Sequence, residues 1–385
     1  MRVLLLGSKE YPALFRSEAC GGIEVHVEAI VKRLLTMGVE VFIVTRLLPN
    51  VKMVERQGKL HVYRVPSLGA RLLRTFTFNL SSFLLSIYLI AKYNIQLIHA
   101  NDFTSGFFSG ILKLSLRRPL LLSAPTFGSK QPEWPHSVKA VLLGFERFSL
   151  MTSDFAFVFV PSDIEYVCMR YGISRRKVAF LGNGVDVERF EKAKGSKLLG
   201  RTRLPEGVKV IMFIGRLTRS KGLQYLIRAF RRVADETESA LLIVGDGTEK
   251  KHLYRIVKET ELESRIIFLG RCLNVENLLA IADVFVLPSL YEGFPIALVE
   301  AMASKKPVIS TRVGAAPFII EDEVDGFLIE PGDVDQLSHA ILRVLSDREL
   351  CEKVSERACR KVKERYSWDS ICEKIYAVYK RLTES

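Results

Sequence analysis

The sequence has few cysteines, and none of them is spaced for metal binding or redox chemistry. Only six of its 385 residues are cysteine. They are scattered along the chain, at Cys20, Cys168, Cys272, Cys351, Cys359 and Cys372. No pair has the spacing of zinc ligands or of a CxxC motif, which argues against a cysteine metal site. The pattern instead indicates reduced, mostly buried thiols in a cytosolic protein.

Signals for secretion and membrane insertion are missing or weak. The N-terminal segment MRVLLLGSKEYP has an apolar run too short for a signal peptide and no cleavage site, so we expect a first strand there. Residues 75–91 carry no charge, but Asn79 and several hydroxyl residues interrupt them. They also fall short of the roughly 20 apolar residues that a membrane span needs. We expect a buried crossover helix there, and docking of this domain on a membrane surface stays open.

Acidic residues are scarce in the first half of the chain. Residues 1–185 carry 23 Lys and Arg against 12 Asp and Glu, a balance of +11, whereas residues 186–385 carry 33 against 31, a balance of +2. A basic first half predicts contact with an anionic membrane face or a phosphorylated acceptor. Nucleic acid is not expected as a partner, because no nucleic-acid-binding module is recognisable. A basic solvated surface without any ligand remains the alternative.

Short apolar runs alternate with amphipathic stretches throughout, which predicts parallel strands joined by helices. The strands are expected at residues 2–6, 40–45, 60–65, 96–99, 120–123, 155–160, 178–181, 209–214, 240–244, 266–269, 284–287, 308–310 and 326–329. The pattern restarts after Asn183, and the lysine-rich residues 191–203 are expected to join two domains. We therefore predict an α/β fold of two doubly wound, Rossmann-like domains, residues 1–190 and 191–367, facing across a cleft.

The segment GRLTRSKG follows the strand predicted at residues 209–214. Gly215 begins it, and Arg216 and Lys221 lie on either side of a turn that opens a helix at about Leu223. Two cations and a helix start at the carboxyl end of a parallel strand predict a diphosphate site. The next strand ends in VGDG, where Gly245 allows close backbone approach to a base or ribose.

Two carboxylates flank a tight turn in the segment ADVFVLPSLYEGFPIALVEAMA, which begins at Ala282. Glu292 lies in the turn and Glu300 about one helical turn into the following helix. The amides at the helix start suit an anionic or hydroxyl-rich ligand. Carboxylates would repel phosphate, so sugar or ribose hydroxyls are the better partners. A pair of helix-capping carboxylates without a ligand is the alternative.

The first half offers two further candidate positions. Gly21 and Gly22 precede a helix, which suggests a phosphate or sugar approached by bare backbone. A plain flexible turn is the alternative. His99, Asn101 and Asp102 follow the strand core Gln96 to Ile98, at its carboxyl end, and are expected to point into the cleft. A structural histidine is the alternative for His99.

Taken in order, these segments resemble the glycosyltransferases of family 4 (glycosyl transferases group 1), which have the GT-B fold. The matching segments are GGIEVHV at Gly21, IHAND at Ile98, ERFSLMTSD at Glu146, NGVDVERF at Asn183, GRLTRSKG at Gly215, VGDG at Val244, ADVFVLPSLYEGFPIALVEAMA at Ala282 and GFLIEPGD at Gly326. The resemblance covers nearly the whole chain. It implies retaining transfer of a hexose-type sugar from a UDP- or GDP-linked donor to a lipid-linked or polysaccharide acceptor, with no cofactor and no essential metal. It also implies a cytoplasmic enzyme, with the inner face of the cell membrane as a second expected location.

The resemblance assigns roles to individual residues. Arg216 and Lys221 would neutralise the leaving diphosphate. Glu292 would hold the sugar hydroxyls, and Glu300 the ribose. The full expected donor-binding set is Gly21, Gly22, Gly215, Arg216, Lys221, Gly245, Arg271, Glu292, Gly293, Phe294, Pro295, Ile296 and Glu300, and the catalytic set is His99, Asn101, Arg216, Lys221 and Glu292. The C-terminal residues 368–385 would form a helix that packs back on the first domain.

The sequence departs from the family pattern at three places. Asn101 stands where many relatives have a second histidine credited with contacting the sugar, and it cannot carry a proton away. Phe318 stands near a usual carboxylate, and a histidine is missing from APTFGSK, which begins at Ala124. Two alternatives therefore stay open: a non-catalytic sugar-nucleotide binding protein, and a sugar-nucleotide epimerase with the same fold.

Overall fold

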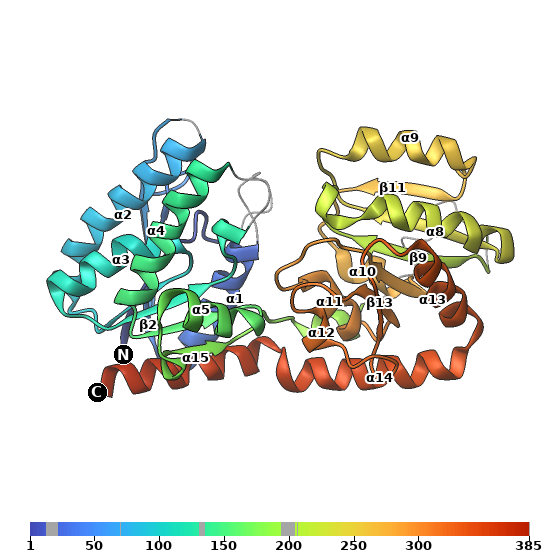
Figure 1. Cartoon of the computed structure of the whole chain (residues 1–385). Helices are drawn as coiled ribbons and strands as arrows, with labels where there is room; N and C mark the ends of the chain where they lie inside the picture. The colour runs from blue at the N-terminus through green and yellow to red at the C-terminus, as the bar shows by residue number, and fades with distance from the viewer. Residues whose placement is uncertain (13–21, 70, 131–134, 194–204, 206, 385) are drawn as a thin grey trace. The chain divides into compact units, whose positions relative to one another are not determined.

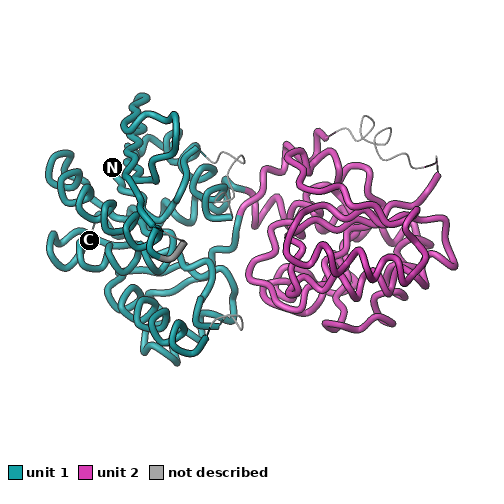
Figure 2. The backbone as a smooth tube through the Cα atoms, turned by 90° about the horizontal axis from the view of Figure 1, so that it is seen from above, with its two compact units in different colours: residues 1–183, 368–385 teal, residues 184–367 magenta. Residues whose placement is uncertain are grey.

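The computed structural model describes residues 1–12, 22–69, 71–130, 135–193, 205 and 207–384, and the chain alternates strands and helices throughout (Figure 1). It divides into two compact units (Figure 2). Unit 1 comprises Met1–Asn183 with Trp368–Ser385, and unit 2 comprises Gly184–Ser367. The chain first passes from unit 1 to unit 2 after Asn183. The sequence predicted this domain boundary at residue 190. Most of the predicted linker, residues 191–203, lies outside the described residues.

Unit 1 is built on an eight-stranded sheet of order β3-β4-β2-β1-β5-β6-β7-β8. Its strands are β1 Arg2–Leu6, β2 Glu40–Arg46, β3 Val54–Gln57, β4 Leu60–Val65, β5 Leu97–Ala100, β6 Leu120–Ala124, β7 Phe155–Val158 and β8 Val178–Phe180. All neighbours pair in parallel except β3, which pairs antiparallel with β4. The polar edge strand β3, VERQ, was not predicted because it has no apolar run.

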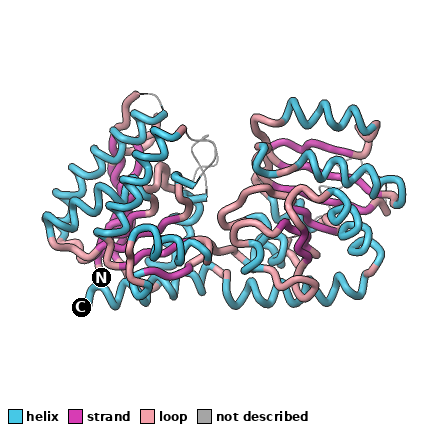
Figure 3. Tube along the Cα trace, in the orientation of Figure 1, coloured by secondary structure: helices cyan, strands magenta, loops and turns pink. Residues whose placement is uncertain are grey.

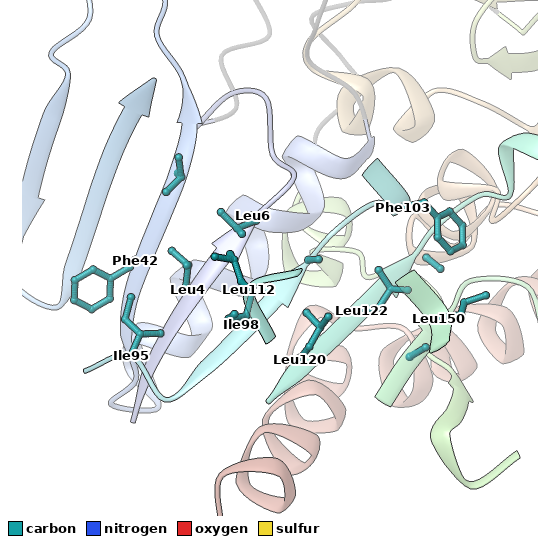
Figure 4. Packing of buried hydrophobic residues seen from close by; sticks show 14 of the residues in the cluster. Leu4, Leu6, Phe42, Ile95, Ile98, Phe103, Leu112, Leu120, Leu122 and Leu150 are labelled. Atoms are coloured by element: carbon teal, nitrogen blue, oxygen red, sulfur yellow. The ribbon is translucent and has the colours of Figure 1, made fainter. Parts of the chain in front are cut away.

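Helices cover both faces of this sheet (Figure 3). They are α1 Gly22–Thr36, α2 Arg71–Tyr93, α3 Phe103–Leu116, α4 His136–Thr152, α5 Ser162–Tyr171 and α15 Trp368–Glu384, with short 3-10 turns at Gly128–Lys130 and Arg175–Lys177. α2 packs on α3 and α3 on α4, while α15 packs on α1. Because successive strand residues face opposite sides, Leu4, Ile98 and Leu122 face the α2–α3–α4 layer and share its core (Figure 4).

The crossover helix predicted at residues 75–91 is present as α2, but it is not fully buried. One side, with Phe78, Leu89 and Ile90, belongs to the core of unit 1. The opposite side leaves large apolar residues exposed, among them Leu84 at 60%. The prediction of a buried helix was therefore half wrong, because a run of uncharged residues does not reveal how many of its faces are covered. Among the described residues, Leu73–Tyr93 alone is long and apolar enough to cross a membrane, by length and composition.

Unit 2 has a six-stranded, fully parallel sheet of order β11-β10-β9-β12-β13-β14. Its strands are β9 Lys209–Ile214, β10 Ser239–Val244, β11 Ile266–Gly270, β12 Val284–Leu287, β13 Val308–Thr311 and β14 Phe327–Ile329. Its helices are α6 Val187–Glu191, α8 Leu223–Glu236, α9 Lys250–Thr260, α10 Val275–Ala280, α11 Ile296–Ala303, α12 Ala316–Ile319, α13 Val334–Ser346 and α14 Arg348–Arg365, with a 3-10 turn at Arg219–Lys221. The predicted α/β class with parallel sheets is confirmed.

Each sheet reverses its winding direction at one place. In unit 1 the strand order changes direction between β1 and β5, and in unit 2 between β9 and β12. The loops that follow the two strands on either side of this reversal run to opposite faces of the sheet and leave a crevice between them. Doubly wound folds bind ligands in this crevice. The structure therefore directs attention to the residues after β9 and β12 in unit 2, and after β1 and β5 in unit 1.

Candidate functional site

The loop between β9 and α8 carries the two predicted phosphate cations. Gly215 follows β9, and its amide donates to the Val244 carbonyl at 3.0 Å. Arg216 is exposed, and no ion pair joins it to any residue that the structure describes. The chain then forms the 3-10 turn Arg219–Lys221 and enters α8 through Gly222, which has a φ of 63°. Arg216 is therefore a cation held at the switch point and available to a ligand.

Lys221 and Glu292 form an ion pair across this switch point. The Lys221 ammonium donates to Glu292 Oε2, and the two side chains are only 16% and 13% exposed. The Ser289 hydroxyl donates to the same carboxylate oxygen at 3.2 Å. The amide of Leu290 also donates to the Ser220 carbonyl at 2.7 Å, which ties the loop after β12 to the loop after β9. Two residues 71 positions apart in sequence are thus held in direct contact.

The turn between Glu292 and α11 is fixed from behind by a second loop. The Ala315 amide donates to the Gly293 carbonyl at 2.9 Å. Gly314 has a φ of 56°, and a Cβ there would collide with the Glu292 and Gly293 carbonyl oxygens. Beyond this turn, Phe294 is partly exposed, Pro295 is buried just before α11, and Ile296 is the first residue of the helix. The Leu298 amide already donates to the Pro295 carbonyl at 3.1 Å. The first amides of a helix have no partner within it, so those of Ile296 and Ala297 can serve a ligand.

Glu300 lies in α11, half-buried beside an ion pair that the sequence did not suggest. Arg189 of α6 pairs with Glu276 of α10 at 2.6 Å. Burial raises the pKa of Glu300 to about 7, the Arg189 charge counteracts this rise, and the Glu276 charge adds to it. Glu300 is therefore a carboxyl group that titrates near neutral pH and can both accept and donate hydrogen bonds.

Two other predicted donor-binding residues lie along the same edge of the unit 2 sheet. Gly245 follows β10 with a φ of 136°, and a Cβ there would collide with the Gly215 carbonyl oxygen. Close packing within the protein therefore already explains this glycine, without a base or ribose. Arg271 follows β11 and is exposed. It lies at the same sheet edge as Arg216, because all these strands are parallel.

In unit 1, Asn101 lies at the carboxyl end of β5, next to the loop after β1. Its side chain is 2% exposed, and its amide nitrogen donates to the Leu6 carbonyl at 3.0 Å. Its Oδ1 is buried without a hydrogen-bond partner among the described residues. The following Asp102 caps α3 by accepting a hydrogen bond from the Ser105 amide at 2.7 Å, and burial raises its pKa. Asn101 thus holds the two central strands together at the switch point of this unit.

His99 does not lie where the sequence interpretation placed it. The ring is fully buried, Nδ1 is 2.7 Å from the Tyr379 hydroxyl of α15, and Nε2 is 2.8 Å from the Ser123 hydroxyl of β6. Burial lowers its pKa to about 3, so the ring is neutral at ordinary pH. The predicted catalytic role of His99 is therefore contradicted, because both ring nitrogens are used in the core and neither reaches a surface.

The double glycine before α1 is only partly described. Gly21 lies outside the described residues, and Gly22 is the exposed first residue of α1. In the first turn of that helix, Glu24 accepts a hydrogen bond from the Lys9 amide at 3.2 Å. This bond attaches the start of α1 to the loop after β1.

The structure therefore gathers Gly215, Arg216, Lys221, Glu292, Gly293 and Ile296 around the switch point of unit 2, with Glu300 further along α11. Asn101 and Gly22 belong to unit 1. The sequence analysis missed the contact of Ser289 with Glu292, although Ser289 lies only three residues before it. The sequence analysis also missed Arg189 and Glu276, because no local pattern links them to Glu300. Within the described ranges, no group of three or more His, Cys, Asp or Glu side chains is placed to hold a metal ion.

Comparisons with known proteins bear on the family and the fold of the chain. Residues 196–361 match the family model described as glycosyl transferases group 1, and residues 20–189 match the one described as glycosyltransferase family 4. An uncharacterized glycosyltransferase of Methanocaldococcus jannaschii is 29% identical over 96% of both chains. The UDP-Gal:alpha-D-GlcNAc-diphosphoundecaprenol alpha-1,3-galactosyltransferase of Escherichia coli is 29% identical over 82% of this chain and 85% of its own. The structure of sucrose-phosphate synthase from Thermosynechococcus elongatus superposes with a TM-score of 0.86 at 24% identity, covering 99% of this chain and 98% of that one.

Proposed function

Because this chain is a glycosyltransferase that belongs to family 4 and has the GT-B fold, we propose that it transfers a hexose-type sugar from a nucleoside diphosphate sugar, with retention of configuration. The proposed acceptor is a lipid-linked sugar or a polysaccharide. The observation that carries this proposal is the contact between Lys221 and Glu292 at the switch point of unit 2, with Arg216 beside it. If Lys221 binds phosphate and Glu292 binds sugar hydroxyls, as we propose, this contact would bring the two parts of the donor side by side.

The charges of the site suit a leaving diphosphate. When the bond between the sugar and the diphosphate breaks, negative charge builds up on the phosphate oxygens. Arg216 and Lys221 are held at the carboxyl ends of the strands, where that charge would develop. Such preorganised cations lower the barrier because they need little rearrangement during the reaction. We propose that these two side chains do this work without a cofactor or an essential metal ion.

The carboxylates suit the rest of the donor. Glu292 follows β12 and would accept hydrogen bonds from sugar hydroxyls, together with the amides at the start of α11. Glu300, further along the helix, would bind the ribose. We propose a uridine or guanosine diphosphate sugar as the donor, and the Escherichia coli relative, whose name specifies UDP-Gal, favours uridine.

The acceptor side of the proposal rests on unit 1 and on the relatives. The name of the Escherichia coli relative specifies a diphosphoundecaprenol-linked acceptor. Residues 1–185 carry the excess positive charge of +11 that a phosphorylated, lipid-linked acceptor would attract. We therefore propose that the protein acts in the cytoplasm, at the inner face of the cell membrane.

A sugar-nucleotide binding protein without transfer activity is the second candidate. One observation favours it: the Asn101 amide nitrogen donates to the Leu6 carbonyl instead of pointing freely outward. This arrangement leaves fewer donors at the position where the family resemblance leads us to expect a histidine. A sugar-nucleotide epimerase has no such observation in its favour.

A donor panel separates the two candidates. Thermal shift with UDP-, GDP- and ADP-sugars would identify the donor, since a bound ligand stabilises the folded protein by mass action. Release of nucleoside diphosphate would then be measured for the wild type, for Lys221→Ala and for the exposed α9 lysine variant Lys251→Ala as control. We expect turnover in the wild type and in Lys251→Ala, and its loss in Lys221→Ala. Tight donor binding with no turnover under any condition would favour the binding protein.

A further inference from the structure

The helix α2 carries a continuous apolar stripe on the side that faces away from the core of unit 1. Its members are Leu73, Phe76, Leu80, Leu84, Ile87 and Tyr88, all exposed. They recur every three or four residues, which is the spacing of one helical face. From Leu73 to Tyr88 the stripe is roughly 22 Å long at the rise of an α-helix. A soluble monomer rarely exposes an apolar row of this length without a partner.

The other side of α2 is anchored in the protein. Phe78, Leu89 and Ile90 are buried in the core of unit 1. The Ser82 hydroxyl donates to the Phe78 carbonyl at 2.8 Å, and the Ser86 hydroxyl donates to the Ser82 carbonyl at 2.6 Å, so the polar groups on this side are satisfied. Removing α2 from the sheet would expose this core face. The helix therefore presents its stripe while it stays part of the fold, which fits a surface contact and not a membrane span.

Cations flank the stripe at both ends, and acidic residues are absent from its surroundings in sequence. Arg74 lies near the first end and Lys92 near the second, and both are exposed. The Lys92 ammonium donates to the Tyr88 hydroxyl at 2.6 Å and lies 5.1 Å from the centre of that ring. No Asp or Glu occurs between Glu55 and Asp102. An apolar stripe with a basic border and an aromatic residue beside a cation matches the interface of an anionic bilayer.

The same charges argue against a second copy of the chain as the partner. If two α2 stripes packed against each other in parallel, Arg74 would meet Arg74. If they packed antiparallel, Arg74 would meet Lys92. No acidic residue of α2 would compensate either arrangement. Anionic lipid headgroups supply that missing negative charge. Each Lys or Arg near the membrane surface increases the binding constant about fivefold.

We propose that the stripe of α2 rests in the headgroup region of a membrane that contains anionic lipids, with the helix lying along the surface. The biological use of this contact rests on the proposed lipid-linked acceptor, because it would bring unit 1 to the layer where such an acceptor is found. The contact itself depends only on the stripe and its bordering cations. Apolar side chains and basic charge each supply part of the binding, as for other amphipathic helices at interfaces.

Vesicle flotation of the full chain tests the proposal. The vesicles would be phosphatidylcholine alone, or phosphatidylcholine mixed with phosphatidylglycerol. We expect the wild type to float with the mixed vesicles, to float less with neutral ones, and to lose binding at raised salt. Leu84→Ser should weaken partitioning about fivefold or more, because it removes a 60% exposed leucine from the stripe. Leu84→Trp should keep it, since tryptophan suits the interface, and Arg74→Glu should weaken it more than fivefold.

The matched control is Met169→Ser, which removes an apolar side chain of α5 in the same unit that is 85% exposed. It should float like the wild type. Equal flotation of Leu84→Ser and the wild type would overturn the proposal, as would equal binding to neutral and anionic vesicles. A wild-type dimer by light scattering that Leu84→Ser converts to monomer would assign the stripe to self-association and also overturn it.

Thermal shift with the donor panel on the same samples reports on unit 2 separately. If the protein fails to float but is still stabilised by a donor, the proposed membrane contact of α2 is wrong and the proposed function stands. If the protein floats but no donor stabilises it, the proposed function is wrong and the membrane contact of α2 is supported. Because Leu84 is 60% exposed, its replacement should leave the packing unchanged. Circular dichroism and thermal melting of each variant check that helix content and stability match those of the wild type.

Discussion

Lys221 donates to the Glu292 carboxylate in the free protein, so the two residues expected to bind different parts of the donor neutralise each other. A nucleoside diphosphate sugar can replace both halves of this pair at once: phosphate for Lys221 and sugar hydroxyls for Glu292. A nucleoside diphosphate without sugar replaces only one half and leaves a carboxylate near its phosphate. If the donor binds here as proposed, we expect the pair to favour the intact donor over the product.

Glu292→Gln should separate these two binding events. The neutral side chain loses its charged hydrogen bonds to the sugar, so affinity for the nucleotide sugar should fall, by roughly 1.5–3 kcal/mol. It also frees Lys221 and removes the repulsion, so affinity for the nucleoside diphosphate alone should rise. Calorimetric titration of both ligands measures the two changes. Glu263→Gln, an exposed carboxylate of the same unit, is the control. If both affinities fell in parallel, the pair would have no part in discrimination.

Glu300 should make the stability of the free protein depend on pH near neutrality. Its pKa is raised from 4.5 to about 7, so the folded protein binds a proton more tightly than the unfolded chain. Stability from this group is then fully present below about pH 4.5 and is lost as pH rises through 7. Glu300→Gln should consequently raise the melting temperature above pH 7 and change it little in acid. Melting curves across this range measure the effect, and an equal shift at every pH would contradict it.

Donor affinity should increase as pH rises through the pKa of Glu300, whereas the contribution of this residue to stability decreases. If ribose hydroxyls donate to Glu300, the ionised carboxylate binds them best, and donor affinity should increase as pH rises through 7. Glu300→Gln should flatten this profile and weaken donor binding at alkaline pH. Calorimetry in buffers of different ionisation enthalpy would show proton release on binding. A pH-independent affinity in the wild type would remove Glu300 from the ribose site.

His99 should matter for stability and not for the donor. His99→Leu leaves the Tyr379 and Ser123 hydroxyls without their ring partners in the core. Each unsatisfied buried hydroxyl costs about 1–3 kcal/mol, so a clear loss in the free energy of unfolding is expected. Tyr379→Phe removes one of the two bonds and should cost less. Urea unfolding measures both variants. A variant with normal stability but lost turnover would restore a catalytic role for His99.

The sequence predicted those features that depend on local pattern and chain order. Apolar runs predicted thirteen strands near their observed positions. The rule that ligands bind at the carboxyl ends of strands singled out Lys221 and Glu292, which the structure brings into contact. The sequence does not reveal which face of the sheet the His99 side chain lies on. The strand β5 is four residues long and buried at every position, so it shows no alternation of apolar and polar residues. The exposed side of α2 was missed because a run of uncharged residues does not reveal how many of its faces are covered. Arg189 was missed because its contact with Glu276 joins residues 87 positions apart.

Gly222 should be a sensitive backbone position of the proposed donor site. It has a φ of 63°, and a Cβ there would collide with the Pro288 carbonyl oxygen after β12. Gly222→Ala should therefore cost about 1 kcal/mol for the backbone conformation and a further roughly 1–3 kcal/mol for the collision. Relief of the collision would move Lys221 away from Glu292, so donor affinity should fall as well. Urea unfolding and donor titration measure the two effects.

Gly172→Ala is the matched control for this substitution. Gly172 has a similar φ of 68°, but nothing lies within 4 Å of an added Cβ. It should show the backbone cost alone and bind the donor normally. The difference between the two variants isolates the contact between the β9 loop and the end of β12, because the conformational penalty cancels. Equal destabilisation of both variants, with donor affinity unchanged in each, would show that this contact does not position Lys221.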